Sequence, residues 1–162
     1  MSSRIEGRVW MLTGSYPMSV DAKARVTLPA VFRKQLVDGD KKTIYLVPLN
    51  GCVNGFTPEG FEAYVDGLFE YGDHHFDPRS RDDVRLKRGL WARAVEVDID
   101  SAGRVALGKL DVAKAGTRER LGLTADVTVV GAGDHFEVWN TEKWDATQES
   151  LEDDLDALLF HD

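Results

Sequence analysis

Two aspartate–arginine pairs with the same spacing are the residues of this chain best suited to chemistry. Asp21 precedes Arg25 by four positions, and Asp100 precedes Arg104 by the same interval. A guanidinium is a planar fork of donors that suits phosphate oxygens or the edge of guanine. A short carboxylate readily accepts hydrogen bonds from backbone N–H groups in a turn. We predict that each aspartate shapes a turn that presents its arginine; an ion pair that only locks a hairpin is the alternative.

The segments that must position these pairs are also repeated. Alternating apolar residues, typical of strands, frame each pair, with Val26 and Leu28 in the first copy matched by Val105 and Leu107 in the second. Residues 44–47 align with 127–130 once a four-residue insertion is allowed. The chain is therefore a tandem duplication of one strand-rich unit, and such a unit normally buries its open face against its twin.

Several stretches around the pairs match a known family. They are Leu12, Thr13 and Gly14; residues 20–33 (VDAKARVTLPAVFR); residues 97–104 (VDIDSAGR); Leu121, Gly122 and Leu123; residues 129–139 (VVGAGDHFEVW); and Trp144. In this order they closely resemble the MraZ proteins, bacterial transcriptional regulators with two AbrB-like repeats. The resemblance covers about residues 11–160.

The resemblance implies an α+β fold in which two pseudo-symmetric AbrB-like repeats form one swapped-hairpin-type barrel, each followed by helices. It implies a sequence-specific DNA-binding regulator that assembles as a ring-like homo-oligomer on short direct repeats in a promoter. The expected target is its own promoter, upstream of cell-division and cell-wall genes. The expected location is cytoplasmic and nucleoid-associated.

We expect four basic residues to contact DNA. Arg25 is the first choice for a base or phosphate contact, with Lys23 beside it, Arg33 on phosphates and Arg104 as the pseudo-symmetric partner of Arg25. Asp21, Asp100 and Gly103 are expected to shape the turns. Ala24 stands where the family usually has glycine, so we predict that the first turn avoids a positive φ. The second repeat, which keeps its glycine, is expected to be the more structural one.

The predicted organisation has five parts. Residues 1–10 form a leader, in which Ile5, Glu6, Gly7 and Arg8 resemble a protease site left by cloning, so that the native start is expected at Met11. Residues 11–70 are the first repeat with a helix, 71–94 a linker and connecting helix, 95–146 the second repeat, and 147–162 an acidic helix or tail. No apolar run approaches the roughly 20 residues that span a bilayer, and no hydrophobic signal segment is present.

Helical periodicity is clearest in three segments. Thr57 and Pro58 predict the start of a helix whose apolar positions lie within 61–69. Residues 81–94 and about 141–160 predict two more amphipathic helices. The apolar faces within 61–69 and 86–94 are candidate subunit contacts.

The negative charge is concentrated near the C-terminus. The net charge is −8, but residues 142–162 contain eight acidic residues and one lysine, which leaves 20 acidic and 19 basic residues elsewhere. A nearly neutral body binds phosphates weakly at one site, so several joined sites are expected to supply the affinity. Basic residues gather at 23–42 and at 79–93.

No cofactor or metal is expected. Cys52 is the only cysteine and is read as a small buried hydrophobe. His74 and His75 lie beside aspartates, but no histidine or cysteine elsewhere has ligand spacing. His135 is read as a structural histidine.

Two other classes of protein remain as alternatives. An aspartyl hydrolase would pair Asp21 with Asp100 across the pseudo-dyad, although an arginine four residues later would hold each carboxylate ionised. An antitoxin-like interaction module of the AbrB fold would bind a partner through the acidic tail. The duplication argues against the module, because such proteins usually dimerise from one copy. We predict that the protein is not an enzyme.

Overall fold

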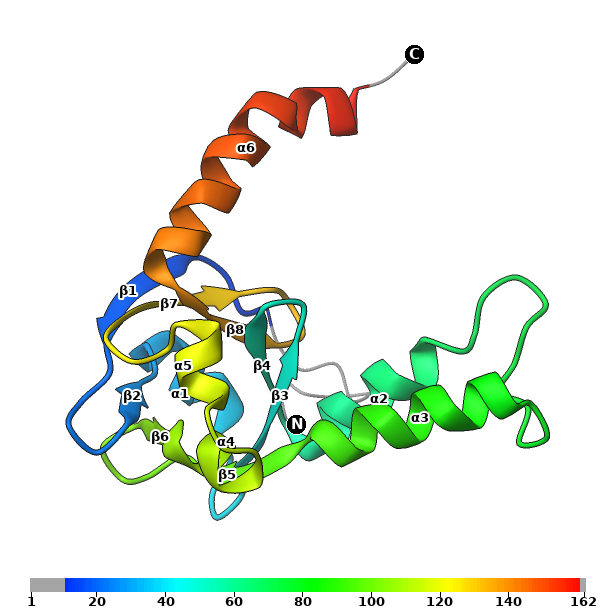
Figure 1. Ribbon diagram of the computed structural model, residues 1–162, viewed down its shortest axis with the longest axis horizontal. Coiled ribbons are helices and arrows are strands. Elements are labelled where there is room, and N and C mark those ends of the chain that lie inside the picture. The colour runs from blue at the N-terminus through cyan, green and yellow to red at the C-terminus, as the bar shows by residue number, and fades with distance from the viewer. Residues whose placement is uncertain (1–10, 161–162) are drawn as a thin grey trace.

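The structure, a computed structural model, describes residues 11–160 and shows the two repeats as matching series of elements (Figure 1). The first repeat contains β1 (Ser15–Ser19), β2 (Arg25–Thr27), α1 (Ala30–Leu36), β3 (Thr43–Leu49), β4 (Cys52–Phe56) and α2 (Pro58–Gly67). After α3 (Arg81–Arg93), the second contains β5 (Val95–Asp98), β6 (Arg104–Ala106), α4 (Gly108–Ala113), α5 (Thr117–Leu121), β7 (Asp126–Gly131), β8 (Phe136–Asn140) and α6 (Thr141–Leu159). The α+β class is confirmed, whereas the predicted leader lies outside the described residues.

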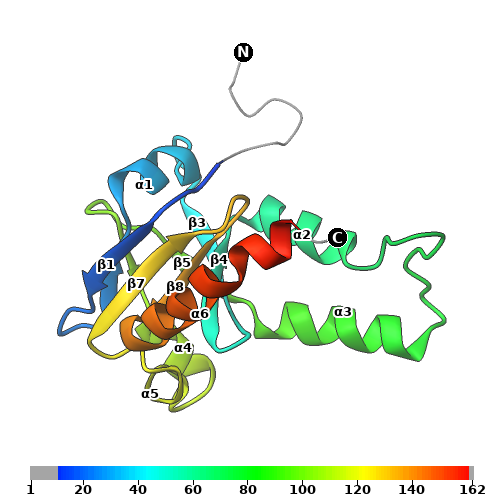
Figure 2. The ribbon, with the colours of Figure 1, turned by 90° about the horizontal axis from the view of Figure 1, so that it is seen from above.

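The strands of the two repeats are interleaved in one antiparallel sheet. Its order is β1-β7-β8-β4-β3-β5, so each repeat gives its first strand to the other half of the sheet. Ser15 pairs with Val130 at one edge and Thr43 with Asp98 at the other, while Val53 opposite Val138 joins the halves (Figure 2). Neither repeat could therefore complete its part of the sheet alone.

The predicted closed barrel is not observed. The six-stranded sheet is open, and β2 and β6 form a separate two-stranded ribbon. The physical reason lies at the edge strands, because β1 and β5 each run into an aspartate–arginine turn and continue as a strand of only three residues. These short strands pair with each other and not with the sheet.

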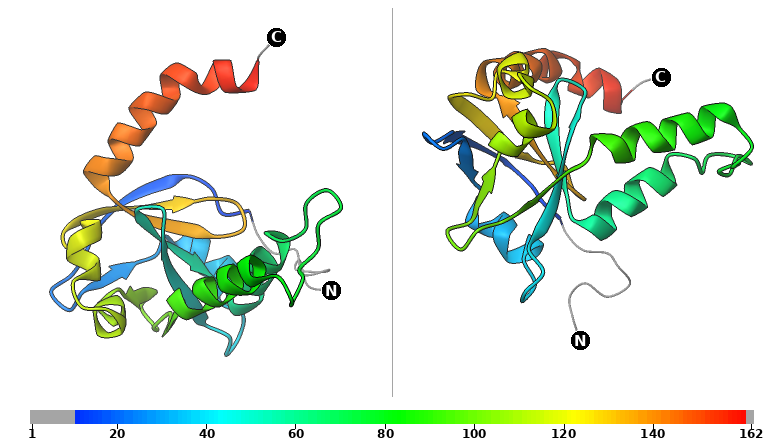
Figure 3. Two further views of the ribbon diagram at one scale, coloured as in Figure 1. Left: turned by 45° about the vertical axis from the view of Figure 1, so that its right-hand side comes forward. Right: turned by 60° about the horizontal axis from the view of Figure 1, so that its bottom comes forward.

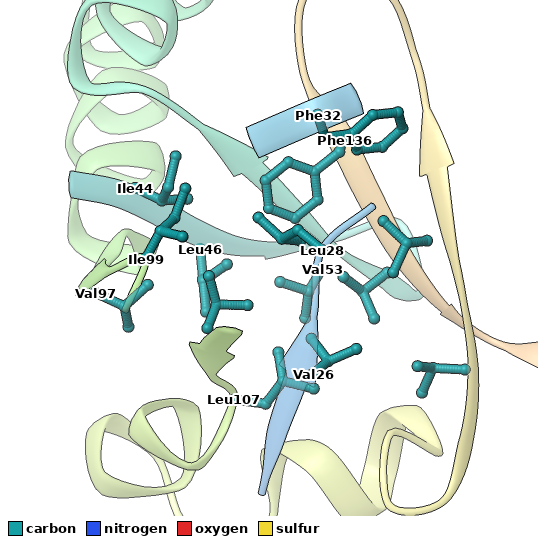
Figure 4. Close-up of a cluster of buried hydrophobic side chains, with 14 of the residues drawn as sticks. Val26, Leu28, Phe32, Ile44, Leu46, Val53, Val97, Ile99, Leu107 and Phe136 are labelled. Atoms are coloured by element: carbon teal, nitrogen blue, oxygen red, sulfur yellow. The ribbon is translucent and has the colours of Figure 1, made fainter. Parts of the chain in front are cut away.

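The main core lies between the ribbon and the sheet and draws on both repeats. Val26 and Leu28 of the first repeat and Val105 and Leu107 of the second are fully buried. They pack in one cluster with residues of β3, β5 and β8 (Figure 4). The apolar alternation that framed the two pairs in the sequence is thus the alternation that closes the core.

A second core lies between α2, α3 and the sheet. Phe61, Val65 and Phe69 pack with Val47, Phe56 and Leu90, and α2 and α3 run side by side away from the sheet (Figure 3). The hypothesis that the apolar face at 61–69 forms a subunit contact is wrong for Phe61, Val65 and Phe69, which are buried within their own chain, whereas Leu68 is 38% exposed. On α3, Leu90 is buried but Leu86 is half exposed.

Helix α2 begins at the predicted capping signal, and α6 begins at a cap that the sequence analysis did not name. Thr57 accepts a hydrogen bond from the Gly60 N–H at 3.0 Å, and Pro58 occupies the first turn of α2. Asn140 caps α6 by accepting from the Lys143 N–H at 3.0 Å. Helix α6 then continues without a break past the predicted boundary at 146/147. Within residues 11–160, no helix is both long and apolar enough to cross a membrane.

Candidate nucleic-acid interface

The Asp21 carboxylate organises the first turn, which we call loop 1 (residues 20–25). One of its oxygens accepts from the backbone N–H groups of Lys23 and Arg25, both at 2.9 Å. The other oxygen accepts from Nε of Arg25 at 2.8 Å. The carboxylate therefore fixes the backbone of the turn and one edge of the guanidinium at the same time.

The second turn, loop 2 (residues 99–104), repeats this arrangement. Asp100 accepts from the N–H groups of Ala102 and Arg104 at 2.9 Å and from Nε of Arg104 at 2.9 Å. The Asp100 N–H donates to the carbonyl of Arg104 at 2.9 Å, as the Asp21 N–H does to that of Arg25. The two loops are the same structure built twice.

Each arginine forms the ion pair of the alternative interpretation and still has donors to spare. Only Nε is engaged by the aspartate, and among the described residues no hydrogen bond involves the terminal nitrogens of Arg25 or Arg104. The two side chains are 27% and 32% exposed. The ion pair therefore orients the guanidinium and leaves its outer fork free to bind.

The ribbon sets the direction of both arginines. Val26 lies opposite Val105 and both are fully buried. Because side chains alternate between the two faces of a strand, Arg25 and Arg104 project from the face opposite these valines. Arg25 lies opposite Ala106 and Arg104 opposite Thr27, so the pseudo-dyad places one arginine near each end of a short ribbon.

Both aspartates are held in the ionised form. The backbone N–H of Arg25 is the main cause that lowers the pKa of Asp21 below its ordinary value, helped by the Arg25 side chain and the Lys23 N–H. The N–H of Arg104 has the same effect on the pKa of Asp100. Two carboxylates that are each ionised by their own arginine do not share a proton, which excludes the acid–base pair of an aspartyl hydrolase.

The prediction for Ala24 is wrong. Its φ is +61°, in the left-handed region, and Gly103 at the matching position has a φ of +82°. The Ala24 N–H donates to the Asp21 carbonyl at 3.0 Å, as the Gly103 N–H does to the Asp100 carbonyl at 2.9 Å. These hydrogen bonds and the ribbon impose one turn on both sequences, and alanine adopts it at a cost of about 1 kcal/mol.

The remaining predicted contacts are distributed unequally. Lys23 is exposed in loop 1. Arg33, although close to Arg25 in sequence, lies against loop 2, where its Nη1 donates to the Ala102 carbonyl at 3.2 Å. A cavity of about 470 Å³ beside loop 2 is lined by Arg33, Lys34 and Lys42 together with Asp100 and Gly103. The interleaving of the repeats brings these cations of the first repeat to loop 2 of the second. No local pattern in the sequence predicts this position.

Loop 1 has a different neighbour. The Gly108 N–H at the start of α4 donates to the Ala24 carbonyl at 3.3 Å, and a Cβ on Gly108 would lie 3.4 Å from that of Ala24. Thus each loop is covered by a helix of the other repeat, and the cavity lined by Arg33, Lys34 and Lys42 lies beside loop 2.

A third aspartate–arginine pair escaped the sequence analysis. Asp111 accepts from the backbone N–H of Arg118 at 3.0 Å and from its Nε at 2.9 Å. Arg118 Nη1 also donates to the Leu123 carbonyl at 3.4 Å, so this guanidinium is used on both sides. The pair joins α4 to α5, and its seven-residue spacing gave no repeat to detect. It shows what a purely structural pair looks like in this fold.

The three described histidines each contact different protein groups. His74 contacts the Phe69 carbonyl and, at 3.2 Å, the Asp83 carboxylate, whereas His75 contacts Glu70 at 2.6 Å. His135 stacks on Phe56 and contacts Asp134 and Glu137. Burial alone would lower the pKa of His135, but these two carboxylates raise it overall. Within residues 11–160, no three His, Cys, Asp or Glu side chains form a group suited to a metal.

Cys52 is a buried thiol at the start of β4. Burial, with a contribution from the charge of Glu137, raises the pKa of this thiol to about 12. The thiolate is the nucleophilic form of cysteine, so Cys52 is unreactive at neutral pH and packs as a hydrophobic residue.

Comparison with known proteins matches the two repeats seen in the structure. The family model described as "MraZ protein, putative antitoxin-like" matches residues 11–81 and 90–158. The transcriptional regulator MraZ of Gluconobacter oxydans (strain 621H) is 35% identical over 138 residues, which are 82% of this chain and 77% of that protein. That of Marinomonas sp. (strain MWYL1) is 32% identical over 151 residues, 88% of this chain and 93% of that protein. That of Ligilactobacillus salivarius (strain UCC118) is 29% identical over 149 residues, 91% of this chain and 94% of that protein. As the motifs predicted, this chain belongs to the MraZ family.

Proposed function

We propose that this protein regulates transcription by binding double-stranded DNA through loops 1 and 2. The observation that carries the proposal is the fixed, outward display of Arg25 and Arg104, whose terminal nitrogens make no hydrogen bond within residues 11–160. The names of its relatives, which are transcriptional regulators, support the same conclusion.

The proposed contacts divide into two kinds. The terminal nitrogens of Arg25, with Arg104 as its pseudo-symmetric partner, suit a bidentate contact to guanine or a phosphate. Lys23 beside Arg25, and Arg33 beside loop 2, suit phosphates, which position a protein without reading sequence. The major groove of B-DNA is wide enough to admit a two-stranded β-ribbon, and β2 and β6 form such a ribbon.

Assembly is the second part of the proposal. Residues 142–162 hold most of the net charge of −8, and one copy offers few cations to DNA. Joining several such sites raises avidity by roughly 10² to 10⁴. A ring-like homo-oligomer on an array of short direct repeats meets this need. The proposed target is the promoter of its own gene and of the cell-division and cell-wall genes downstream, bound in the cytoplasm at the nucleoid.

The test is fluorescence anisotropy with a labelled DNA fragment from upstream of the gene, across a salt series. Wild type should bind tightly and with a steep salt dependence, and Arg25→Ala should weaken binding by about 1–3 kcal/mol, a factor of roughly 5 to 150. Arg104→Ala should weaken it as well. Where the lost contact is a phosphate, the salt slope should fall by about 0.9.

Arg79→Ala is the matched control, because it removes the same charge from a side chain that is 91% exposed in the segment between α2 and α3. It should leave affinity within about twofold. If wild type does not prefer the upstream fragment to scrambled DNA at low salt, the DNA-binding proposal is wrong.

A second candidate, an antitoxin-like interaction module, is favoured by the exposure of the acidic helix α6, none of whose residues is buried. In that case the Leu155→Ser, Leu158→Ser variant would lose binding to a protein partner. It would keep DNA binding by a single copy, which separates the two functions.

A further inference from the structure

Among the described residues, helix α6 has no packing partner along most of its length. It spans 19 residues and none of them is buried. Its last turns expose Leu155, Leu158, Leu159 and Phe160, of which Leu158 and Phe160 are 65% and 78% exposed. The helix rises from the sheet and diverges from the paired helices α2 and α3 (Figures 1 and 3). An amphipathic helix usually buries its apolar stripe, so a surface to receive it should exist.

The stripe is bordered by acidic residues. At 3.6 residues per turn, Leu151, Leu155 and Leu158 share one side of α6, with Glu152 on one flank and Asp154 on the other. The helix as a whole carries seven acidic residues and one lysine. A receiving surface must therefore be apolar at its centre and positive around it.

The described residues contain a groove with these properties. It has a volume of about 610 Å³ and lies between α3 and the turn that joins β3 to β4. Leu49, Leu86 and Leu90 supply apolar surface, whereas Arg85 and Arg93 supply cations, opposed by Asp82 alone among the lining residues. The two arginines are eight residues apart on α3, about 12 Å at 1.5 Å per residue. Helix α3 carries five basic and two acidic residues, the reverse of α6.

We infer that α6 of one copy docks into the α3 groove of a second copy. The apolar stripe would cover Leu86, which is 48% exposed, and the acidic flanks would face Arg85 and Arg93. Within one chain, α6 leads away from α3 (Figure 1), so the occupant comes from another molecule. This inference rests on the proposed homo-oligomer and names its contact surface.

The contact has a consequence for symmetry. Because it joins a helix on one copy to a different surface on the next, it is heterologous, and such contacts generate closed rings or open filaments rather than simple dimers. Each copy would then present its β2–β6 ribbon in the same relation to the assembly, as binding to direct repeats requires.

The test is the mass of the full chain by sedimentation velocity at low salt, without DNA. Three double variants are compared: Arg85→Glu, Arg93→Glu in the groove; Leu155→Ser, Leu158→Ser on α6; and Arg81→Glu, Arg88→Glu as control. The control makes the same charge change on the same helix at two exposed residues that do not line the groove. Circular dichroism verifies that each variant is folded.

Wild type and the control should assemble, and the groove and α6 variants should remain monomeric at the same concentration. Mixing the two monomeric variants should give a dimer with one copy of each. The groove variant supplies an intact α6, which binds the intact groove of the α6 variant. The reciprocal contact cannot form, because both of its surfaces are mutated. Neither variant alone can form that species.

Three results would overturn the inference. They are a monomeric wild type, a groove variant that assembles like wild type, and a mixture of folded variants that stays monomeric. Loss of assembly would show as mass, whereas failure of the DNA-binding proposal would show as no response to Arg25→Ala, so the two failures are distinguishable.

Discussion

Loops 1 and 2 have the same interior and different surroundings. In both, an aspartate accepts two backbone N–H groups and one Nε–H at 2.8–2.9 Å. Loop 1 contains Ala24 and lies against Gly108 of α4, whereas loop 2 contains Gly103 and lies under Arg33 of α1. The aspartate and the ribbon therefore determine the conformation of the turn. The residue packed on the turn determines whether alanine or glycine fits at the left-handed position.

The difference in cover has a steric basis. A Cβ built on Gly103 would lie 2.2 Å from Cδ and Nη1 of Arg33, a distance that real Cβ atoms do not show. At loop 1 the facing residue of α4, Gly108, has no side chain, and a Cβ there would lie 3.4 Å from that of Ala24. Arg33 can therefore reach the Ala102 carbonyl only because loop 2 has glycine. Glycine in loop 2 therefore leaves room for the Arg33 side chain, whereas loop 1, with alanine, faces a glycine.

The largest effect is expected from Gly103→Ala. Alanine at a φ of +82° is strained, and its Cβ must displace Arg33. We expect the free energy of unfolding to fall by about 1–3 kcal/mol. The mirror change Ala24→Gly should stay within about 1 kcal/mol of wild type, because relief of strain is offset by the greater freedom of glycine in the unfolded chain. Urea denaturation measures the free energy of unfolding of both variants. Equal losses of stability would mean that the residues packed on the two loops do not distinguish them.

A smaller effect is expected from Arg33→Ala. The variant loses the hydrogen bond to the Ala102 carbonyl, worth about 1 kcal/mol, but also removes a buried Nε that has no partner among the described residues. We therefore expect a loss below about 1 kcal/mol. Lys34→Ala, which lines the same cavity, is the control and should change stability by less than about 0.5 kcal/mol.

Combining Arg33→Ala with Gly103→Ala sharpens the comparison. If the displaced guanidinium causes part of the loss, the double variant should be more stable than the sum of the single effects predicts, by about 0.5 kcal/mol or more. Strict additivity would assign the whole effect of Gly103→Ala to its φ. The same thermodynamic cycle with Lys34→Ala should show no coupling.

Local features of this fold could be predicted from the sequence, and features created by the interleaving could not. The Thr57 cap, the extent of α6 and the repeated strands follow from residues that are close in the chain. The position of Arg33 over loop 2 and the open sheet depend on which repeat supplies each edge strand. The φ of Ala24 could not be predicted from the preference of alanine alone, because the hydrogen bonds of the turn override that preference.

The smallest effect is expected in the pH dependence of stability. It tests whether Asp21 and Asp100 have equivalent surroundings within their turns. The N–H groups of Arg25 and Arg104 lower the pKa of Asp21 and Asp100 from its ordinary value. A carboxyl whose pKa is lower in the folded state contributes stability that is present above its unfolded pKa and is lost as pH falls through the folded value. Stability should therefore decline below about pH 4, and Asp21→Asn and Asp100→Asn should each make that decline shallower. Urea midpoints measured from pH 7 to pH 3 provide the slopes. Matching changes in the two variants would mean that each carboxylate senses only its own turn, whereas a larger change for Asp100→Asn would show that the cations around loop 2 also act on its carboxylate.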